Sequence, residues 1–358
     1  MDVTPETRVP KRDVSAANHL NLREEIMKTR FLGVLLALAS FCALPIFAEQ
    51  TNKADIGKIR LKFQDVINTN DPTFNQELGI NDFGVIAGYF GSGAAGHPNK
   101  GYTIFRQNKK FTQADFFNEN FPGSVQTQVT GINNRGGFFL SFTVTVGFWA
   151  DSNNVSLVNN NFGFVNIGGQ NGTFIKVNNP NTGTINGVVT NQLLGVNDIN
   201  VAVGFYIDTA GATHGYTYDI STGAYSANID DPNGVGTTTA AAINDLYQIV
   251  GFYVDTNNVT HGFFESNGVF RTIDALNAKA TSLLGLNNFG EAVGFDIDQA
   301  GAMHGIICNV YTGATKQVDD PNGIGTTTFN GLNDFGQIVG FYVNGAGNTI
   351  GLFATPKL

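Results

Sequence analysis

The sequence predicts an all-β fold, a six-bladed β-propeller of four-stranded antiparallel blades whose last blade is closed by the N-terminal strand. Three observations lead to this prediction. One unit recurs six times, and each complete unit contains four short runs rich in β-branched and aromatic residues. The sixth unit lacks its fourth run, and a matching run lies near the start of the chain.

Each unit is marked by an apolar residue, an Asn and then an Asp or Asn. The six copies read GIND, GINN, GVND, AIND, GLNN and GLND, and begin at Gly79, Gly131, Gly195, Ala242, Gly285 and Gly331. The last four begin 47, 43 and 46 residues apart, whereas the first two intervals, 52 and 64 residues, contain insertions. A period in the forties, punctuated by Gly and Asn and without a helical stripe, is typical of propeller blades.

The fourth unit shows the four expected strands most clearly. One runs into the Asn motif, and the others cover residues 248–255, 260–265 and 268–274. β-branched and aromatic residues fill these runs and turn-forming residues separate them. The sequences STG, SNG and YTG, at Ser221, Ser266 and Tyr311, are predicted to be hairpin turns between the third and fourth strands.

The repeated Asn motif is explained by turn chemistry. In NDFG the Asn side chain is expected to cap a tight turn, while Gly84 or Gly336 takes a left-handed backbone conformation. Asn200 replaces this Gly in the third unit, and Asn is the next most tolerant residue there. Tyr247 departs from the pattern in the fourth unit, and a change of turn type is the explanation that the sequence offers.

The two ends of the chain are predicted to complete one blade. The sixth unit stops after its third strand, and KIRLKFQDV at residues 58–66 precedes the first unit. We expect residues 60–63 to pair with residues 350–354, closing the ring and leaving no open strand edge. An open array of sheets is the alternative, which this complementary half-blade fits poorly.

The N-terminal region is predicted to be a targeting segment. Residues 1–26 form a charged leader that is disordered or precedes the true start at Met27, and residues 27–48 have the charged start, short apolar run and small final residue of a secretory signal. A retained membrane anchor is the alternative, although the apolar run is short for a span. The mature chain, 49–358, is then one propeller domain that is secreted, periplasmic or at the cell surface.

Charge and cysteine content limit the partners. Without residues 1–48 the chain keeps 14 Lys and Arg against 24 Asp and Glu, a net charge of −10. Such a chain suits neither nucleic acid nor, after signal cleavage, an anionic membrane as a partner, because both need clustered cations. Cys308 is then alone in an apolar run, where we expect a buried, inert thiol and no intrachain disulfide.

The repeats resemble the bacterial extracellular repeat proteins called HAF repeats, in which an HAF-like triplet accompanies a GIN..G.IVG.Y stretch. The matching triplets begin at His214, His261 and His304, each followed by Gly where the family has Ala. The second and sixth units carry Phe162 and Ile350 in place of the His. The resemblance covers roughly residues 56 to 356. It implies export and a propeller-like fold, and it transfers no catalytic residue.

Three units place an Asp six residues before the His, which raises the question of a metal or acid–base site. These pairs are Asp208 with His214, Asp255 with His261, and Asp298 with His304. Each His begins a third strand, about two strand spacings of ~4.8 Å out from the innermost strand, so the three His are too far apart to share one ion. We expect a structural hydrogen bond across one hairpin loop in each unit.

Acidic loops collect at one end of the predicted propeller. Because the second hairpin and the link to the next blade emerge on the same side, this end gathers Asp208, Asp230, Asp231, Asp255, Asp298, Asp319 and Asp320. Such a surface could attract calcium or a cationic partner. No unit shows a calcium-loop pattern of alternating oxygen ligands, so we favour turn chemistry and expect no cofactor and no metal.

The second unit departs most from the others. It has a lengthened strand and an Asn-rich loop beginning at Asp151, with the sole tryptophan, Trp149, at the root of that loop. An aromatic ring beside polar loops could stack on a sugar. Trp149 also aligns with Tyr206, Tyr253 and Tyr342, which favours a strand-packing position.

No residue of the sequence is nominated as a nucleophile or phosphate-binding group. We therefore interpret the chain as an exported, monomeric, non-catalytic binding module for extracellular glycan or protein. A propeller hydrolase or lyase with its site at an acidic mouth of the ring is the first alternative, and a structural cell-surface protein is the second. An enzyme should direct unlike His, carboxylate or Arg groups into the central channel, whereas a module should repeat the same residues there.

Overall fold

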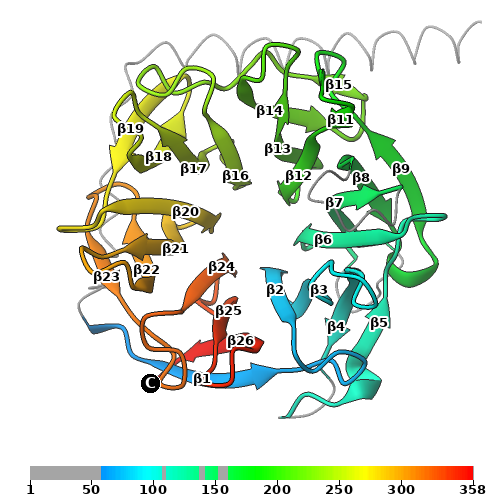
Figure 1. Ribbon diagram of the computed structural model, residues 1–358, viewed down its shortest axis with the longest axis vertical. Coiled ribbons are helices and arrows are strands. Elements are labelled where there is room, and N and C mark those ends of the chain that lie inside the picture. The colour runs from blue at the N-terminus through cyan, green and yellow to red at the C-terminus, as the bar shows by residue number, and fades with distance from the viewer. Residues whose placement is uncertain (1–57, 107–109, 137–141, 152–159, 358) are drawn as a thin grey trace, which may run out of the picture. The chain divides into compact units, whose positions relative to one another are not determined.

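Six four-stranded sheets are arranged around a central axis in the computed structural model, which describes residues 58–106, 110–136, 142–151 and 160–357 (Figure 1). All described residues belong to one compact unit, Ala54–Leu358. The predicted six-bladed β-propeller is confirmed. The leader, the signal segment and most of the insertion in the second unit lie outside the described residues.

Each blade is an antiparallel sheet that follows the chain from the axis outward. Blade one contains β2 (Asn75–Ile80), β3 (Val85–Phe90), β4 (Lys100–Phe105) and β5 (Phe116–Asn118). Blade two contains β6 (Gln126–Ile132), β7 (Val144–Ala150), β8 (Phe162–Ile167) and β9 (Thr173–Val177). Blade three contains β12 (Asn191–Val196), β13 (Val201–Ile207), β14 (Thr213–Asp219) and β15 (Ala224–Tyr225).

The other three blades repeat this order. Blade four contains β16 (Thr239–Ile243), β17 (Ile249–Val254), β18 (Thr260–Ser266) and β19 (Val269–Ile273). Blade five contains β20 (Ala280–Leu286), β21 (Glu291–Ile297), β22 (Met303–Asn309) and β23 (Thr315–Gln317). Blade six contains β24 (Thr328–Leu332), β25 (Ile338–Val343), β26 (Thr349–Pro356) and β1 (Leu61–Val66).

Small elements lie in the connections between strands. A two-stranded hairpin of β10 (Thr184–Ile185) and β11 (Val188–Val189) precedes blade three. The short 3-10 helices η2 (Gln113–Asp115) and η4 (Gly169–Asn171) lie in blades one and two. No helix among the described residues is long and apolar enough to span a bilayer.

The ring closes through strand β1, which lies beside β26 (Figure 1). The pairing is antiparallel and joins Leu61 to Pro356, Phe63 to Ala354 and Val66 to Gly351. Leu61 and Val66 are buried on the closing strand. The predicted closure by the N-terminal strand is therefore confirmed, and the open array is wrong. The register differs from the prediction, because residues 61–63 pair with residues 354–356, whereas residues 351–353 pair with residues 64–66.

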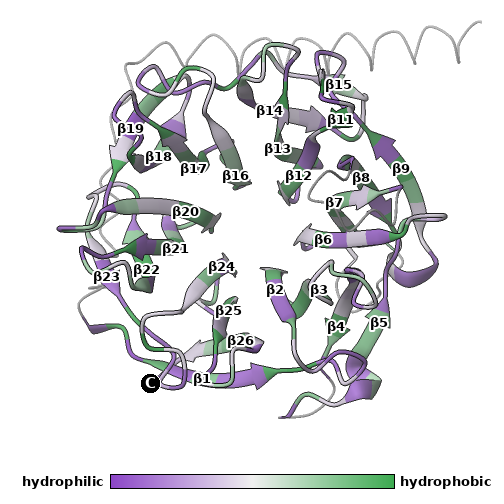
Figure 2. Cartoon of the chain, viewed as in Figure 1, coloured by the Kyte–Doolittle hydropathy of each residue, from purple (hydrophilic) through white to green (hydrophobic). Residues whose placement is uncertain are grey.

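The hydrophobic core is divided among the seams between blades. Figure 2 shows apolar segments in the strands of all six blades. The buried apolar side chains of the described chain form six clusters, and each cluster joins two neighbouring blades. For example, Val250 and Phe264 of blade four pack with Leu283 and Ile306 of blade five. A single blade therefore cannot bury its own faces, and closure of the ring completes the last seam.

Cys308 is fully buried at the seam between blades four and five. Burial raises the pKa of its thiol to about 12, so the reactive thiolate is suppressed. The prediction of a buried free cysteine is confirmed.

Candidate functional site: the axial ring of the turn face

The two ends of the propeller differ in their chain connections. The turns after the first strand and the turns between the third and fourth strands lie at one end, which we call the turn face. The hairpin loops between the second and third strands and the links between blades lie at the other end, which we call the link face.

The Asn of the repeated motif links every blade to the next at the turn face. Each Asn Nδ2 donates to the backbone carbonyl of the equivalent Asn one blade on, at 3.0–3.3 Å. The members, in ring order, are Asn81, Asn133, Asn197, Asn244, Asn287 and Asn333, and all are buried. The last bond runs from Asn333 back to Asn81, so the ring is closed.

The same Asn side chains cap their own turns, as the sequence predicted. Asn81 Oδ1 accepts the backbone N–H groups of Phe83 and Val85, at 3.1 and 2.9 Å. Gly84 and Gly336 take positive φ values of 73° and 68°. Tyr247 also has a positive φ, 58°, so the expected change of turn type is wrong and the aromatic residue adopts the same strained backbone as Gly.

The residue after each Asn forms a second closed ring around the axis. Its members are Asp82, Asn134, Asp198, Asp245, Asn288 and Asp334, and each backbone N–H donates to Oδ1 of the next member at 2.6–2.9 Å. We call the four Asp and two Asn of this ring the axial ring. Its side chains are half-buried and line a small cavity of about 70 Å³ on the axis.

The order of residues in the axial ring places the two amides opposite each other. Asn134 Nδ2 donates to Oδ2 of Asp82 and Asp198, and Asn288 Nδ2 donates to Oδ2 of Asp245 and Asp334. At the other two junctions, Asp198 with Asp245 and Asp334 with Asp82, two carboxylates are neighbours. Each amide thus separates two acids, and negative charge concentrates at two opposite junctions.

Electrostatics show the effect of this crowding. Burial, together with the neighbouring carboxylates of Asp334 and Asp198, raises the pKa of Asp82. The pKa of Asp198 is raised by burial and by the carboxylates of Asp245 and Asp334. A positive charge on the axis would relieve this repulsion.

The inner strands approach one another closely next to the axial ring, where each motif begins with a small residue. We call these residues, Gly79, Gly131, Gly195, Ala242, Gly285 and Gly331, the collar. A Cβ added to Gly131 would lie 3.0 Å from the Gly195 Cα, and one added to Gly331 would lie 3.1 Å from the Gly79 Cα. Each first strand bulges at this position, for example between Val129 and Gly131. The Gly that begins the repeated motif therefore permits the inner strands to approach closely around the axis.

Exposed apolar side chains surround the axial ring. The residue after each ring member is Phe83, Ile199, Leu246, Phe289 or Phe335, with exposed fractions of 41 to 67%, and Tyr247 adds a further ring at 57%. We call these six residues the crown. Arg135 occupies the equivalent position in blade two. The turn face thus combines an acidic centre with an apolar border.

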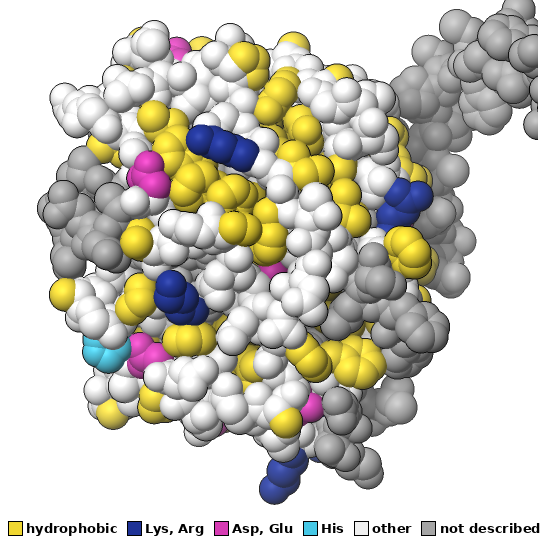
Figure 3. Space-filling model, turned by 90° about the vertical axis from the view of Figure 1, so that its right-hand side faces the viewer, with side chains coloured by type: hydrophobic (Ala, Val, Ile, Leu, Met, Phe, Trp, Pro, Cys, Tyr) yellow, Lys and Arg dark blue, Asp and Glu magenta, His cyan; other side chains and the backbone are white. Residues whose placement is uncertain are grey.

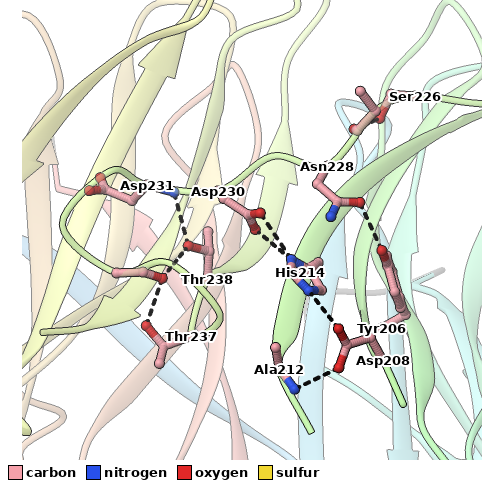
Figure 4. A network of polar contacts seen from close by, with 12 residues as sticks. Tyr206, Asp208, Ala212, His214, Ser226, Asn228, Asp230, Asp231, Thr237 and Thr238 are labelled. Carbon is pink, nitrogen blue, oxygen red and sulfur yellow. Dashed lines mark hydrogen bonds and ion pairs between the residues drawn. The ribbon is translucent and has the colours of Figure 1, made fainter. Parts of the chain in front are cut away.

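The acidic residues predicted as a surface lie at the link face, where His214, His261 and His304 are each bracketed by two Asp. Figure 4 shows the bracket of blade three, where His214 Nδ1 lies 2.9 Å from Asp230 and Nε2 lies 3.4 Å from Asp208. The predicted contact between Asp208 and His214 across the hairpin is present. The closer partner of His214 is Asp230 in the link, and the sequence analysis missed this contact.

Blades four and five repeat this arrangement. His261 lies 2.8 Å from Asp274 and 3.6 Å from Asp255, and His304 lies 2.8 Å from Asp319 and 3.5 Å from Asp298. Within the described ranges no group of three or more His, Cys, Asp or Glu is arranged to hold a metal ion. Each bracket lies within one blade and its outgoing link.

Four members of the brackets, Asp208, Asp255, Asp298 and His304, have shifted pKa values. Backbone N–H donors, first that of Ala212 for Asp208 and that of Ala302 for Asp298, hold the pKa of these carboxyls below the usual range. Partial burial lowers the pKa of His304, but the hydrogen bond and charge of Asp319, with Asp298 and Asp296 nearby, raise it overall.

Asp231 and Asp320 contribute nothing to the exposed acidic surface, because both are fully buried. Asp231 Oδ1 accepts the backbone N–H of Asn233 at 2.8 Å, and the backbone N–H of Asp231 donates to Thr238 Oγ1 (Figure 4). Asp320 makes the same two bonds with Asn322 and Thr327. These two side chains shape the turn into the next blade.

Trp149 lies on β7 with its ring stacked against Phe121, with 4.3 Å between centroids and 2° between planes. Phe162 covers it further at 4.9 Å, and Lys176 Nζ lies 5.4 Å from its centroid. This aromatic packing fits the strand-packing interpretation of Trp149. The neighbouring residues 152–159, which the sugar-stacking hypothesis needs, lie outside the described residues.

A group of basic residues lies beside the closing strand. Lys58, Arg60, Lys316 and Lys357 line a groove of about 700 Å³ between blades five and six. Lys316 Nζ donates to the Ile59 carbonyl at 2.6 Å, so this cation holds the closing segment. On the side of the molecule shown in Figure 3, Lys and Arg side chains are few and separated from one another.

Comparison with known proteins supports the fold and leaves the family open. No family model matches the chain, and no curated protein matches it. A protein of unknown function from Dyadobacter fermentans is similar over 84% of this chain and 99% of that one, with a TM-score of 0.51 and 8% identity. The resemblance to HAF repeats therefore remains an expectation.

Two further solved structures are similar over most of the chain. A fungal lectin from Aleuria aurantia, described as a six-bladed β-propeller with a novel fucose recognition mode, matches 81% of this chain and 90% of its own, with a TM-score of 0.45 and 9% identity. TolB from Acinetobacter baumannii matches 77% of this chain and 64% of its own, with a TM-score of 0.48 and 10% identity. At these identities the likeness concerns the fold alone.

Proposed function

We propose that this chain is an exported, non-catalytic binding module that docks an extracellular glycan or protein on its turn face. The observation that carries the proposal is the repetition around the axis. The cavity on the axis is lined by an apolar residue, an Asn and an Asp or Asn from every blade. A catalytic centre requires unlike groups with different roles at one point, whereas a repeated lining suits recognition.

The crown provides the second support. Six large apolar side chains stand exposed around the axial ring, and exposed apolar surface rimming a polar centre is typical of an interaction site. Tyr247 is the clearest case, because its aromatic side chain occupies a strained backbone conformation while remaining more than half exposed. The capped turn imposes this conformation, and we attribute the presence of an aromatic residue there to contact with a partner.

A screen with paired variants tests the proposal. The full chain and two double variants, Phe289→Ser/Phe335→Ser on the crown and Asp208→Asn/Asp255→Asn on the link face, are applied to a glycan array and to extracellular protein fractions. We expect a ligand whose binding is lost in the crown variant and kept in the link-face variant. Loss only in the link-face variant, or turnover of a ligand by the wild-type protein, contradicts the proposal.

Export is proposed from the N-terminal sequence alone. Residues 27–48 have the charge and apolar length of a secretory signal. Expression of the full chain in a bacterium, followed by cell fractionation and N-terminal sequencing, should yield an extracytoplasmic protein that begins at Glu49. Recovery of the uncleaved chain from the cytoplasm contradicts export, and recovery from the membrane supports the anchor instead.

A further inference from the structure

We infer that the turn face recognises a protein partner through a Lys or Arg side chain that enters the axial ring while the flanking apolar residues of the partner pack on the crown. This inference rests on the proposed function, since it names the chemistry of the docked partner. It is independent of the link face and of its His brackets.

Unbalanced negative charge is the first argument. The axial ring holds four carboxylates in a half-buried setting, and none of the ion pairs found among the described residues involves a member of this ring. Two opposite junctions bring carboxylates together without an amide between them. A cationic group on the axis would face acids on both sides.

The kind of cation follows from geometry. Within the described chain no three acidic or His side chains converge closely enough to hold a metal ion, so the carboxylates are spread around the axis rather than focused on a point. An ammonium with three donors or a guanidinium with five suits such a spread set of acceptors better than a compact ion does. Each Asp has Oδ1 bound to a backbone N–H and Oδ2 bound to an Asn amide, so the lone pairs that remain on the four carboxylates are directional.

The apolar crown favours a Lys or Arg side chain of a protein over a free amine as the bound cation. Lys and Arg carry apolar stems that cover hydrophobic surface while the charged head reaches a polar site. Phe83, Phe289, Phe335 and Tyr247 also offer aromatic faces near the entering cation, and such contacts attract it further. A neutral sugar could stack on these rings but would gain nothing from the four carboxylates.

Arg135 breaks the border at one place. It replaces the apolar crown residue in blade two and brings a positive charge beside Asn134 in the axial ring. An approaching basic side chain would be repelled there and attracted at the far side of the ring. The charge of residue 135 can therefore be varied without altering the axial ring itself.

Selection from a random peptide library displayed on phage tests the inference, with the immobilised full chain as bait. We expect enrichment of peptides in which Lys or Arg is flanked by aromatic or aliphatic residues. Their affinity should fall at least tenfold for Asp198→Asn/Asp334→Asn and weaken as salt increases. Selected peptides without a basic residue, or equal affinity for this variant, would overturn the inference.

A charge-conserving variant is the matched control. Asn134→Asp/Asp198→Asn moves one amide by one position and keeps four carboxylates, so binding should stay within about threefold, a change below 1 kcal/mol. Loss of binding in this control, with its melting temperature unchanged, contradicts a role for charge. If ring variants fail to fold, Arg135→Glu decides, because this exposed substitution should tighten peptide binding severalfold, and weaker or unchanged binding refutes the inference.

Two further measurements separate this inference from the proposed function. Retained peptide or glycan binding in the ring variants, with loss in the crown variant, rejects the basic partner but preserves docking on the turn face. Calorimetric titration with calcium should give no heat at the ring. Calcium heat that disappears in Asp198→Asn/Asp334→Asn would replace the basic side chain by a metal ion.

Discussion

The turn face and the link face use the same residue types, Asp and Asn, in different ways. At the turn face the hydrogen bonds run from blade to blade and close two rings that include all six units. At the link face the Asp–His–Asp brackets of blades three, four and five each stay within one blade and its outgoing link. The difference shows that the repeated motif serves closure of the ring, whereas the brackets are local supports.

The largest effect should come from breaking the ring of buried amides. Asn81→Ala removes two caps and one bond to the next blade and leaves buried backbone groups unpaired, which should cost roughly 3–5 kcal/mol of unfolding free energy. Urea denaturation followed by circular dichroism measures the loss. Asn257→Ala, in an exposed link-face hairpin, is the control and should stay within about 0.5 kcal/mol. Equal effects of the two substitutions would falsify the distinction between the faces.

The collar should be the next most sensitive feature. Gly131→Val forces a branched side chain to within about 3.0 Å of the Gly195 Cα and the Leu194 carbonyl, and should lower the unfolding free energy by roughly 2–3 kcal/mol. Ala242→Gly, the reverse change in blade four, should cost only about 0.5–1 kcal/mol through backbone entropy. A thermal melt in which Gly131→Val behaves like wild type would show that the inner strands can separate freely.

A bracket at the link face should matter less and should depend on pH. His304→Gln should lower the unfolding free energy by no more than about 1 kcal/mol, because the His lies near the surface and its charged hydrogen bond to Asp319 is screened. The pKa of His304 is raised, so its contribution is fully present below its ordinary value near pH 6.5 and is lost as pH rises through the folded value. Melting at pH 5.5 and pH 9 should show the larger difference at pH 5.5. A difference that grows toward pH 9 contradicts the sign of the shift.

The smallest effect on stability should have the opposite sign. Tyr247→Gly relieves a positive φ and should raise the unfolding free energy by about 0.5–1 kcal/mol, while the loss of an exposed aromatic side chain weakens binding at the turn face. Asn200→Gly is the matched change at the equivalent turn of blade three and should have little effect, since Asn tolerates this conformation. A loss of stability in Tyr247→Gly would mean that the aromatic side chain of Tyr247 packs within the propeller.

Much of the fold could be predicted from the sequence, because the number of blades, their strands and their turns depend on the spacing of the repeats and on residues close together in the chain. The period of the motif gave six blades, and the missing fourth strand after β26 required a partner that only residues 58–66 matched. The Asn caps followed from turn chemistry, which operates within four residues. Tyr247 was misjudged because propensity argues against a bulky residue at positive φ, and the surrounding ring imposes that conformation regardless.

The candidate site was largely missed, although its residues were in view. Asp82 and its counterparts were part of the motif that defined the repeats. Because the motif was interpreted only as a turn, the sequence analysis did not predict that these residues meet around the axis. The predicted acidic surface does not include Asp231 and Asp320, because both side chains are buried. The signal that would have found the ring is the order of acids and amides after the six Asn residues, once the blades are set in a circle.

By itself, the sequence determined the number of blades, the turn chemistry and the pairing of the two ends, because these depend on spacing and on backbone conformation along the chain. The tertiary structure decided which side chains meet across the axis, which acids are buried and where apolar residues stand exposed. The physical reason is that six residues separated by more than forty positions in the chain become neighbours only when the ring closes.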